Sequence, residues 1–201
     1  MRKVLEIPAP ELEGFSRVVE CDLPGVKTFR NFVDLDVCRQ LVEGFRARTD
    51  LTAKYDAEDA QHFNGRVFFT SSFRPYLRGR IEEIERRIAP LVEEHLAGFP
   101  VTAYGRPHWT EFPNEAPQIA WWPASFGMPF HHDRDHGRLH TALVPLTDDF
   151  EGGGTAFEKH KVIVRPGAGD LLIFDGSLMH GAATVTSGER FTLIMWFHRA
   201  D

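Results

Sequence analysis

Residues 171–198 read LLIFDGSLMHGAATVTSGERFTLIMWFH, with two apolar runs on either side of a segment that contains His180. Both runs have the length and the β-branched and aromatic content of strands, and Ser187 and Gly188 indicate a turn before the second run. Because side chains alternate along a strand, the second run separates into two faces. One face carries Arg190, Thr192, Ile194 and Trp196, and the other carries Phe191, Leu193, Met195 and Phe197. The stretch therefore predicts two strands, one before and one after His180.

The chain from about Val101 onward has the same character, with short apolar runs separated by Gly, Pro and Asp. The candidate strands are 118–122, 139–146, 155–157, 161–164, 170–174 and 190–198. Several short strands at such spacing predict a mainly β fold, a sandwich or barrel of the jelly-roll kind.

Helical patterns occur only before this β region. Residues 34–48 have apolar side chains at Val37, Leu41 and Phe45, which is the spacing of an amphipathic helix. A second helix is predicted from residue 75 to about residue 89, with a kink at Pro90 or a second short helix through Leu96. We expect one domain over residues 1–201, in which a helical region at about 30–97 braces a barrel core at about 101–199.

The composition excludes several classes of protein. The 201 residues are 42% hydrophobic and 26% charged, as in soluble globular domains. A net charge of -6 argues against nucleic acid or an anionic membrane as partner, because these select basic faces. Cys21 and Cys38 cannot form a disulfide framework, and no apolar run is long enough for a signal peptide or for the roughly 20 residues of a membrane span. We therefore expect a cytoplasmic protein.

A candidate metal site follows from three residues. His131 and Asp133 stand two positions apart, so on an extended segment their side chains leave the same face and can bind one ion. The best candidate for a third ligand is His180, which lies between two predicted strands. Two imidazoles and one carboxylate are typical of non-haem Fe(II) oxygenases, although zinc or nickel would accept the same ligands. For His131 and Asp133 alone, a surface pair without a metal is the alternative.

Arg190 is the candidate anion-binding residue. It follows His180 by ten positions, and a strand, a turn and a second strand can return it to the neighbourhood of that histidine. An arginine that points into a barrel requires an anion, and its planar guanidinium binds a carboxylate through two hydrogen bonds. Thr192, on the same face, can donate its hydroxyl to the same anion. The alternative is an exposed Arg190 at the end of a hairpin, paired with Glu189.

Further motifs stand in a fixed order around these residues: HHD at 131–133, RLHT at 138–141, GGGTAF at 152–157, PGAGDL at 166–171, HG at 180–181, and Arg190. With this set of motifs, residues 118–199 resemble the Fe(II)- and 2-oxoglutarate-dependent oxygenases, in particular their prolyl 4-hydroxylase-like branch. The helical part before residue 100 carries no such motif.

The resemblance implies a double-stranded β-helix in which His131, Asp133 and His180 hold Fe(II) and Arg190 binds the far carboxylate of 2-oxoglutarate. It further implies that O2 converts 2-oxoglutarate to succinate and CO2 while a C–H bond of the substrate is hydroxylated, and it allows ascorbate as an additional cofactor. Halogenases that resemble this family carry a small residue at the position of Asp133, so the carboxylate favours hydroxylation.

The contacts to 2-oxoglutarate beyond Arg190 depart from the family pattern. Many relatives have a tyrosine ahead of His-x-Asp, where this chain has Trp121, Trp122 and Pro123. We therefore predict that Trp122, Thr192 and Thr141 contact the co-substrate. An indole can donate a hydrogen bond but cannot accept one, so Trp122 would replace only the donor of such a tyrosine.

Four residues are candidate contacts to the primary substrate: Trp121, Arg138, His140 and Trp196. Two of them have structural alternatives. Trp121 alternates with Trp122 and is a candidate for a buried core aromatic. His140 shares a strand face with Ala142 and Val144. Its alternative is a structural histidine whose hydrogen bonds are satisfied within the protein.

The leading hypothesis is a dioxygenase that hydroxylates an unactivated C–H bond of a small molecule, an amino acid or an amino-acid residue. A small substrate is favoured over a peptide or protein, because 201 residues leave little beyond a minimal barrel. One alternative is a cupin-type metalloenzyme that does not use 2-oxoglutarate, which would leave Arg190 without an anion. The other is a non-catalytic member of the fold that binds a ligand, and the complete set of metal ligands counts against it. The sequence does not predict the oligomeric state.

Overall fold

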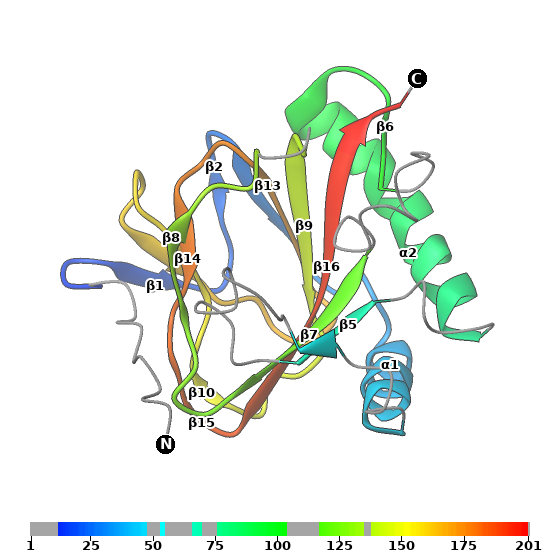
Figure 1. The fold of residues 1–201 in the computed structure, drawn as a ribbon. Helices are drawn as coiled ribbons and strands as arrows, with labels where there is room; N and C mark the ends of the chain where they lie inside the picture. The colour runs from blue at the N-terminus through cyan, green and yellow to red at the C-terminus, as the bar shows by residue number, and fades with distance from the viewer. Residues whose placement is uncertain are drawn as a thin grey trace.

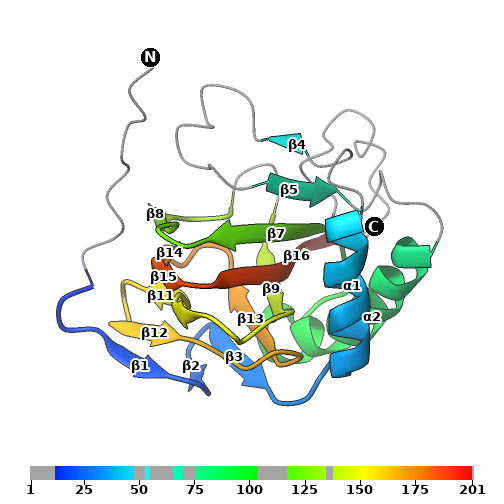
Figure 2. The same cartoon turned by 90° about the horizontal axis from the view of Figure 1, so that it is seen from below.

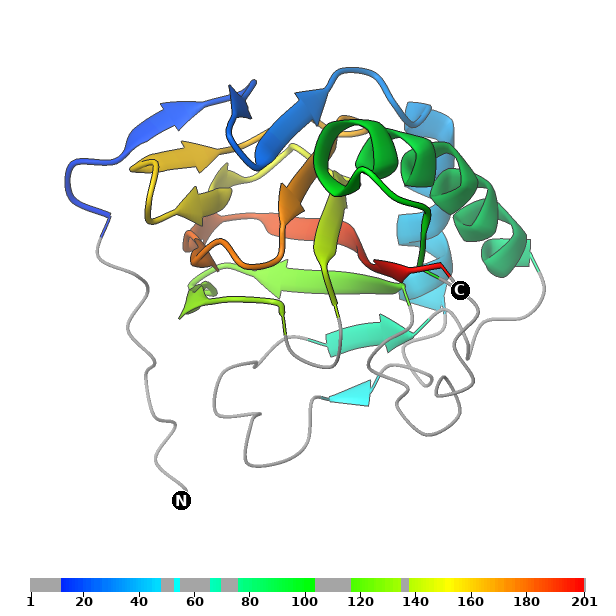
Figure 3. The ribbon, with the colours of Figure 1, turned by 90° about the horizontal axis from the view of Figure 1, so that it is seen from above.

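A large and a small β-sheet form the centre of the structure, a computed structural model that describes residues 12–47, 53–54, 66–69, 76–103, 117–134 and 138–200 (Figure 1). The helices lie on one side of the sheets, and the strands of the small sheet lie on the opposite side (Figure 2). The view from above shows the same arrangement (Figure 3). The prediction of a mainly β fold with bracing helices is confirmed.

The large sheet combines strands from before, between and after the two helices in sequence. Its order along the described residues is β2 (Asp22–Leu23), β3 (Val26–Phe29), β13 (Leu171–Asp175), β9 (His140–Pro145), β16 (Glu189–Arg199), β7 (Gln118–Pro123), β5 (Arg66–Phe69) and β4 (Ala53–Lys54). A further strand, β6 (Val101–Thr102), pairs with the end of β16. The pairings within this sheet are antiparallel.

The small sheet carries two of the candidate metal ligands. Its order is β1 (Ser16–Val18), β12 (Val162–Val164), β11 (Thr155–Phe157), β14 (His180–Ala182) and β8 (Met128–His131). A separate pair consists of β10 (Glu151–Gly152) and β15 (Val185–Ser187). The strands predicted from the sequence are all present to within two residues at each end, whereas the short strands β8, β10, β14 and β15 and those before residue 103 were not predicted.

The helices pack on the outer face of the large sheet. Helix α1 (Leu35–Ala47) begins with a hydrogen bond from the backbone N–H of Cys38 to the carbonyl of Asp34, and it matches the predicted helix. It lies close to α2 (Tyr76–Val92) at Gly44, where an added Cβ would be 2.7 Å from Leu77 Cδ1. A Cβ at this position would require the Leu77 side chain to move, so the absence of a side chain at Gly44 favours the close packing of the two helices. Among the described residues, no helix is long and apolar enough to cross a membrane.

The predicted second helical segment through Leu96 is present, but the first helix extends three residues beyond its predicted end. Helix α2 runs through Pro90 to Val92, and a π-helical segment, η4 (Glu93–Ala97), follows directly. A proline inside a helix removes one backbone hydrogen bond, but the helix continues where packing compensates. Here Ile88 and Val92, on either side of Pro90, are completely buried.

The two faces of the large sheet belong to different cores. The outer face packs on the helices in a cluster that includes Leu41, Phe45, Ile81, Phe191 and Leu193. The inner face packs against the small sheet in a second cluster, whose members include Leu143, Leu172 and Phe174 from the large sheet and Phe157 and Val164 from the small one. The space between the two sheets is therefore the interior of the barrel.

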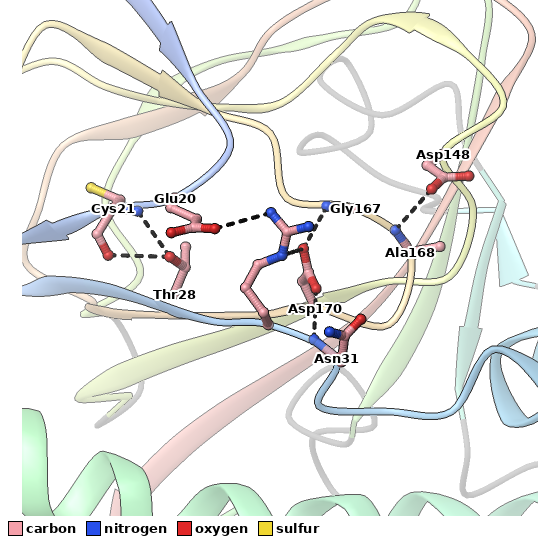
Figure 4. A network of polar contacts seen from close by, with 9 residues as sticks. Glu20, Cys21, Thr28, Asn31, Asp148, Gly167, Ala168 and Asp170 are labelled. Atoms are coloured by element: carbon pink, nitrogen blue, oxygen red, sulfur yellow. Dashed lines mark hydrogen bonds and ion pairs between the residues drawn. The ribbon is translucent and has the colours of Figure 1, made fainter.

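A buried carboxylate ties the start of β13 to the chain before α1. Asp170 is 2% exposed and accepts hydrogen bonds from the backbone N–H groups of Asn31 and Gly167, each at 2.8 Å (Figure 4). The Nε of Arg30 lies 3.2 Å from the second carboxylate oxygen. Because a buried carboxylate is stable only when it is hydrogen-bonded, this network holds the connection between β3 and α1 against the barrel.

Candidate active site

Three candidate metal ligands come together at one end of the barrel interior. His131 is the last residue of β8, His180 is the first residue of β14, and the two are register partners in the antiparallel pair. Asp133 follows β8 by two residues. One donor atom from each of the three side chains lies within 4.8 Å of the other two. The structure thus brings together the residues that the sequence analysis selected as ligands.

The hydrogen bonds of the two histidines orient their rings. His131 Nδ1 lies 3.0 Å from the carbonyl oxygen of Pro129, and His180 Nδ1 lies 2.9 Å from that of Leu178. Since a carbonyl oxygen can only accept, each Nδ1 carries the proton. The lone pair of each Nε2 is then available for a metal, and such backbone contacts are typical of metal-binding histidines.

The Nε2 atoms point at the carboxylate of Asp133. His131 Nε2 lies 3.6 Å from Oδ1, and His180 Nε2 lies 3.5 Å from Oδ2. Metal ligands bond at about 2 Å, so a single ion between these atoms can reach all three. Two imidazoles and one carboxylate, which occupy one side of an ion and leave other positions open, fit the donor set of a non-haem iron centre.

The surroundings of His180 favour its neutral form. Burial lowers the pKa of His180 to about 4, against the opposing effect of Asp133. Its ring packs edge-on against Phe174, with 4.6 Å between centroids. A neutral imidazole is the form that binds a metal, so at neutral pH this histidine needs no deprotonation before it acts as a ligand.

Asp133 is held in place by two hydrogen bonds. The hydroxyl of Thr141 donates to Oδ2 at 2.6 Å, and the backbone N–H of Asp133 donates to the carbonyl of Gly176 at 2.8 Å. The sequence analysis predicted that Thr141 contacts the co-substrate; the structure places its hydroxyl on the metal-ligand carboxylate. A threonine in this position fixes which carboxylate oxygen remains free to bind an ion.

Arg190 is also buried in the barrel, on the inner face of β16. It is 6% exposed, and its Nε donates to Thr192 Oγ1 at 3.1 Å. Its Nη1 donates to the carbonyl of Gly154 at 3.4 Å, and its guanidinium lies 5.9 Å from the ring centre of Trp122. Burial, with a smaller effect of Arg165, lowers the pKa of Arg190 to about 10, so the residue is still charged at neutral pH.

No carboxylate among the described residues neutralises this charge. The ion pairs within the described ranges do not include Arg190. Glu189, the acid that could have paired with it, instead accepts hydrogen bonds from Arg46 and from Trp121 Nε1, each at 2.9 Å. A buried cation with only neutral partners is unfavourable unless an anion joins it, so Arg190 marks an anion site.

The sequence analysis missed the contribution of Gly154 to this pocket. Its φ of 105° is accessible to glycine, and an added Cβ would lie 2.7 Å from Ile163 Cγ2. The backbone of Gly154 can therefore approach closely enough for its carbonyl to meet Arg190. The three consecutive glycines at 152–154 are the signal in the sequence, although they do not show which carbonyl is used.

The predicted substrate contacts divide between the two faces of the large sheet. Trp121 and His140 lie on the outer face, where Trp121 packs against the helix-side cluster and the His140 ring is 6.4 Å from that of Phe99. Trp196 shares the inner face with Arg190 and Thr192, and Arg138 lies over its ring at 4.3 Å. The structure thus brings Trp196 and Arg138 toward the site, and it does not bring Trp121 or His140 there.

The chain matches a family model over part of its sequence and resembles solved structures in its fold. Residues 117–198 match the model of the 2OG-Fe(II) oxygenase superfamily. No curated protein matches the sequence.

Three solved structures illustrate the similarity of fold. A Pseudomonas putida prolyl-4-hydroxylase has 17% identity and a TM-score of 0.67, over 88% of this chain and 94% of that one. The collagen prolyl hydroxylase of Paramecium Bursaria Chlorella virus-1 has 18% identity and a TM-score of 0.63, over 90% and 99%. The α-ketoglutarate-dependent epimerase SnoN from nogalamycin biosynthesis has 19% identity and a TM-score of 0.66, over 88% and 78%. These matches confirm the double-stranded β-helix.

Proposed function

We propose that the protein is a hydroxylase of the 2OG-Fe(II) oxygenase superfamily that uses iron and 2-oxoglutarate, because residues 117–198 match the model of this superfamily. The reaction couples two oxidations. One oxygen atom of O2 enters 2-oxoglutarate, which leaves as succinate and CO2, and the other enters a C–H bond of the substrate, which becomes C–OH. We propose a small molecule or an amino acid as the substrate. An amino-acid residue within a peptide is the alternative substrate, to be tested in the same assay.

The observation that carries the proposal is the combination of the triad with Arg190. A metal site alone is compatible with many enzymes, and a buried arginine alone does not indicate a particular ligand. Together they provide a metal site, at which one end of a ligand can chelate the ion, and an arginine that can bind a carboxylate at the other end of the same ligand. Both lie on the interior of the same barrel. 2-Oxoglutarate has a 2-oxo acid at one end and a carboxylate at the other, and so it matches both.

The protein's own contribution is binding and orientation. Iron, when bound by His131, Asp133 and His180, supplies the activation of O2. Arg190 and Thr192 hold the far carboxylate of 2-oxoglutarate and thereby set the direction from which its other end approaches the triad. Thr141 keeps one oxygen of Asp133 occupied, and the apolar inner cluster around Phe157 and Phe174 keeps water away from the triad.

The two alternative functions fit these observations less well. A cupin-type enzyme without 2-oxoglutarate would leave the buried charge of Arg190 with no anion. A non-catalytic binding protein would not need three ligand atoms within 4.8 Å of one another, two of them oriented by backbone carbonyls.

Anaerobic spectroscopy tests the proposal directly. Fe(II) and 2-oxoglutarate added to the protein without oxygen should produce a metal-to-ligand charge-transfer band, because the co-substrate chelates the iron. Arg190→Ala should need much more 2-oxoglutarate to reach the same band, whereas Arg39→Ala, which changes an exposed arginine on α1, should behave as the wild type. Absence of the band in the wild type would refute the use of 2-oxoglutarate.

Succinate formation in air across a panel of compounds then identifies the substrate. The panel contains free amino acids, small metabolites and proline-containing peptides. We expect one class to raise the rate of succinate release and to yield a product heavier by one oxygen atom. Succinate release without any substrate oxidation across all classes would contradict the assignment as a hydroxylase.

A further inference from the structure

A tight turn at residues 175–178 connects strand β13 to His180. The backbone N–H of Leu178 donates to the carbonyl of Asp175 at 3.0 Å. The carboxylate of Asp175 closes the turn, because its Oδ1 accepts hydrogen bonds from the backbone N–H of Ser177 at 2.8 Å and from the Ser177 hydroxyl at 2.7 Å. An aspartate at the first position favours such a turn, since its side chain pairs with the N–H two residues further on. The Asp175 side chain therefore stabilises the conformation of this turn.

Two backbone carbonyls of the turn contact metal ligands. The carbonyl of Gly176 accepts the backbone N–H of Asp133 at 2.8 Å, and the carbonyl of Leu178 lies 2.9 Å from His180 Nδ1. The first contact fixes the backbone of Asp133, and the second fixes the orientation of the His180 ring. Both leave the metal-binding atoms of the ligands free. The turn thus holds two of the three candidate ligands.

The turn is also packed closely against the segments around it. The N–H of Gly176 donates to the carbonyl of Leu139 at 2.9 Å, and the N–H of Asp175 donates to that of Gly25 at 2.9 Å. A Cβ added at Gly176 would lie 3.1 Å from the Leu139 oxygen and 3.5 Å from Asp133 Cβ. A change in the conformation of the turn would therefore displace the carbonyls that meet the ligands.

Asp175 has a second charged contact, but this contact is weaker. Arg134 Nη2 lies 3.8 Å from its Oδ1, and the Arg134 side chain is 54% exposed, so the ion pair contributes little. Burial by itself raises the pKa of Asp175, but the hydrogen bonds from Ser177, with smaller effects of Arg134 and His140, lower it below its usual value. The carboxylate is therefore charged at neutral pH, and its main partner is the turn.

We propose that Asp175 is a positioning residue for the metal site, which it supports through the turn at 175–178. The inference rests on the metal site of the proposed function. Asp175 acts on the ligands through the carbonyls of Gly176 and Leu178. Without its carboxylate the turn has more conformations, so the two ligands must be ordered when the metal binds. The loss of such outer hydrogen bonds typically lowers metal affinity about ten- to a hundredfold.

Co(II) binding in the absence of 2-oxoglutarate tests the proposal, with a competing chelator to measure the affinity. Asp175→Ala should bind Co(II) about tenfold more weakly than the wild type. Asp175→Asn keeps an oxygen that can accept both hydrogen bonds from Ser177, and it should bind Co(II) as the wild type does. An unchanged affinity in Asp175→Ala would overturn the proposal. An equal loss in Asp175→Asn would also overturn it, because the effect would then come from the charge and not from the turn.

Asp148→Ala is the matched control. Asp148 is exposed, and its Oδ2 accepts the backbone N–H of Ala168 in the turn that precedes β13, at the other end of this strand. Its removal should leave the affinity for Co(II) unchanged. A loss equal to that in Asp175→Ala would show that any weakened turn beside β13 has the same effect, and it would refute a specific role of Asp175.

Two spectra separate positioning from general stability. The visible spectrum of bound Co(II) depends on the arrangement of its ligands, so it should change in Asp175→Ala at saturating metal and stay the same in Asp175→Asn. In the metal-free protein, the 15N shifts of the His180 ring report its tautomer. Asp175→Ala should lower the fraction with the proton on Nδ1, because the Leu178 carbonyl is less ordered. Wild-type spectra of both kinds in Asp175→Ala would overturn the proposal even if the affinity fell.

Urea denaturation of the metal-free proteins shows whether each variant folds. If Asp175→Ala does not fold, Asp175→Ser takes its place, since a serine hydroxyl forms the same kind of turn more weakly. Its affinity for Co(II) should then lie below that of the wild type and of Asp175→Asn. An affinity equal to that of the wild type would overturn the proposal.

The two proposals fail in different ways. A charge-transfer band in the wild type, with unchanged Co(II) affinity in Asp175→Ala, would support the use of 2-oxoglutarate and refute the role of Asp175. A weaker affinity and altered spectra in Asp175→Ala, without a charge-transfer band in the wild type, would refute the proposed co-substrate and support Asp175 as a positioning residue.

Discussion

The two faces of strand β16 have opposite chemistry. The inner face carries Arg190, Thr192 and Trp196, which are buried and polar or capable of hydrogen bonding. The outer face carries Phe191, Leu193, Met195 and Phe197, all buried in the cluster under the helices. Side chains one position apart on the same strand thus serve a ligand site and a purely apolar core.

The difference shows how one strand can meet two demands. The outer face contributes stability through burial, which depends on area and volume and has little directional requirement. The inner face contains a buried cation, Arg190, and an indole N–H, that of Trp196, which have no counter-ion and no acceptor among the described residues and which cost stability in the absence of ligands. Variants of the two faces should therefore separate binding from stability.

The largest effect is expected on the inner side, at the metal site. Asp133→Ala removes the only carboxylate of the triad. We expect Fe(II) binding and succinate formation to fall to background, measured by metal content after desalting and by the turnover assay. Asp149→Ala, at an exposed position, should retain both activities. Retention of bound iron by Asp133→Ala would refute the ligand assignment.

The next effect tests the outer face. Phe191→Ala should lower the free energy of unfolding by about 3–5 kcal/mol, because a buried aromatic ring leaves a cavity. Phe191 is 1% exposed and packs edge-on against Phe45 of α1. Urea denaturation measures the change, and Phe191→Leu should lose less. If Phe191→Ala weakened 2-oxoglutarate binding by the folded protein without loss of stability, the separation of the two faces would be wrong.

A smaller effect is expected from Arg190→Lys on the inner face. Lysine keeps the charge but cannot form two parallel hydrogen bonds to a carboxylate. One lost charge-assisted bond corresponds to a rise of about ten- to a hundredfold in the Kd for 2-oxoglutarate. Titration of the charge-transfer band measures it. Stability should change far less than in Phe191→Ala, and an unchanged Kd would contradict the role of Arg190.

Thr141→Val should weaken iron binding about tenfold, because it removes the hydroxyl that orients Asp133 while keeping the shape of the side chain. Competition with a chelator measures the affinity. Thr141→Ser retains the hydroxyl and should bind iron as the wild type does. Equal affinities for Thr141→Val and the wild type would show that the hydrogen bond does not support the ligand.

The smallest effect concerns Glu85 of α2, under the outer face. Its carboxylate accepts the backbone N–H of Ala103 at 3.1 Å, and burial raises its pKa above the usual 4.5. The folded protein therefore holds this proton more tightly than the unfolded chain does, so stability declines as pH rises from the unfolded to the folded pKa. Glu85→Gln should reduce that decline.

Urea denaturation over a pH series measures this difference. The stability curves of the wild type and Glu85→Gln should diverge across the window between the two pKa values, with the variant more stable above it. Glu83→Gln, at an exposed position of the same helix, is the control. Parallel curves for the wild type and Glu85→Gln would contradict a raised pKa.

The fold was predictable where the sequence pattern is long enough to show a period. Strands β7, β9 and β16 have six or more residues and were placed within one residue at each end. Strands β8 and β14, with four and three residues, show no period of their own and exist because they pair with each other. The end of α2 was misplaced because the packing of Ile88 and Val92 outweighs the local effect of Pro90.

The residues of the candidate site were predictable in part, as the strands were. The spacing of His131 and Asp133 places two side chains on one face, and ordered motifs suggested His180 and Arg190. Alternation also separated Trp121 from Trp122, but it could not show which of the two faces points into the barrel. The same limit applied to His140, whose face turned out to be the outer one.

The sequence by itself determined which residues share a face, which segments are strands or helices, and which chemistry the order of the metal-binding and anion-binding residues can support. Only the tertiary structure decided that Glu189 pairs with Arg46 and Trp121, that Thr141 binds Asp133, and that the N–H of Trp196 has no acceptor within the described part of the chain. The physical reason is the range of the interactions. Periodicity is a property of neighbouring residues, whereas the partner of a buried polar group depends on which distant strand packs against it.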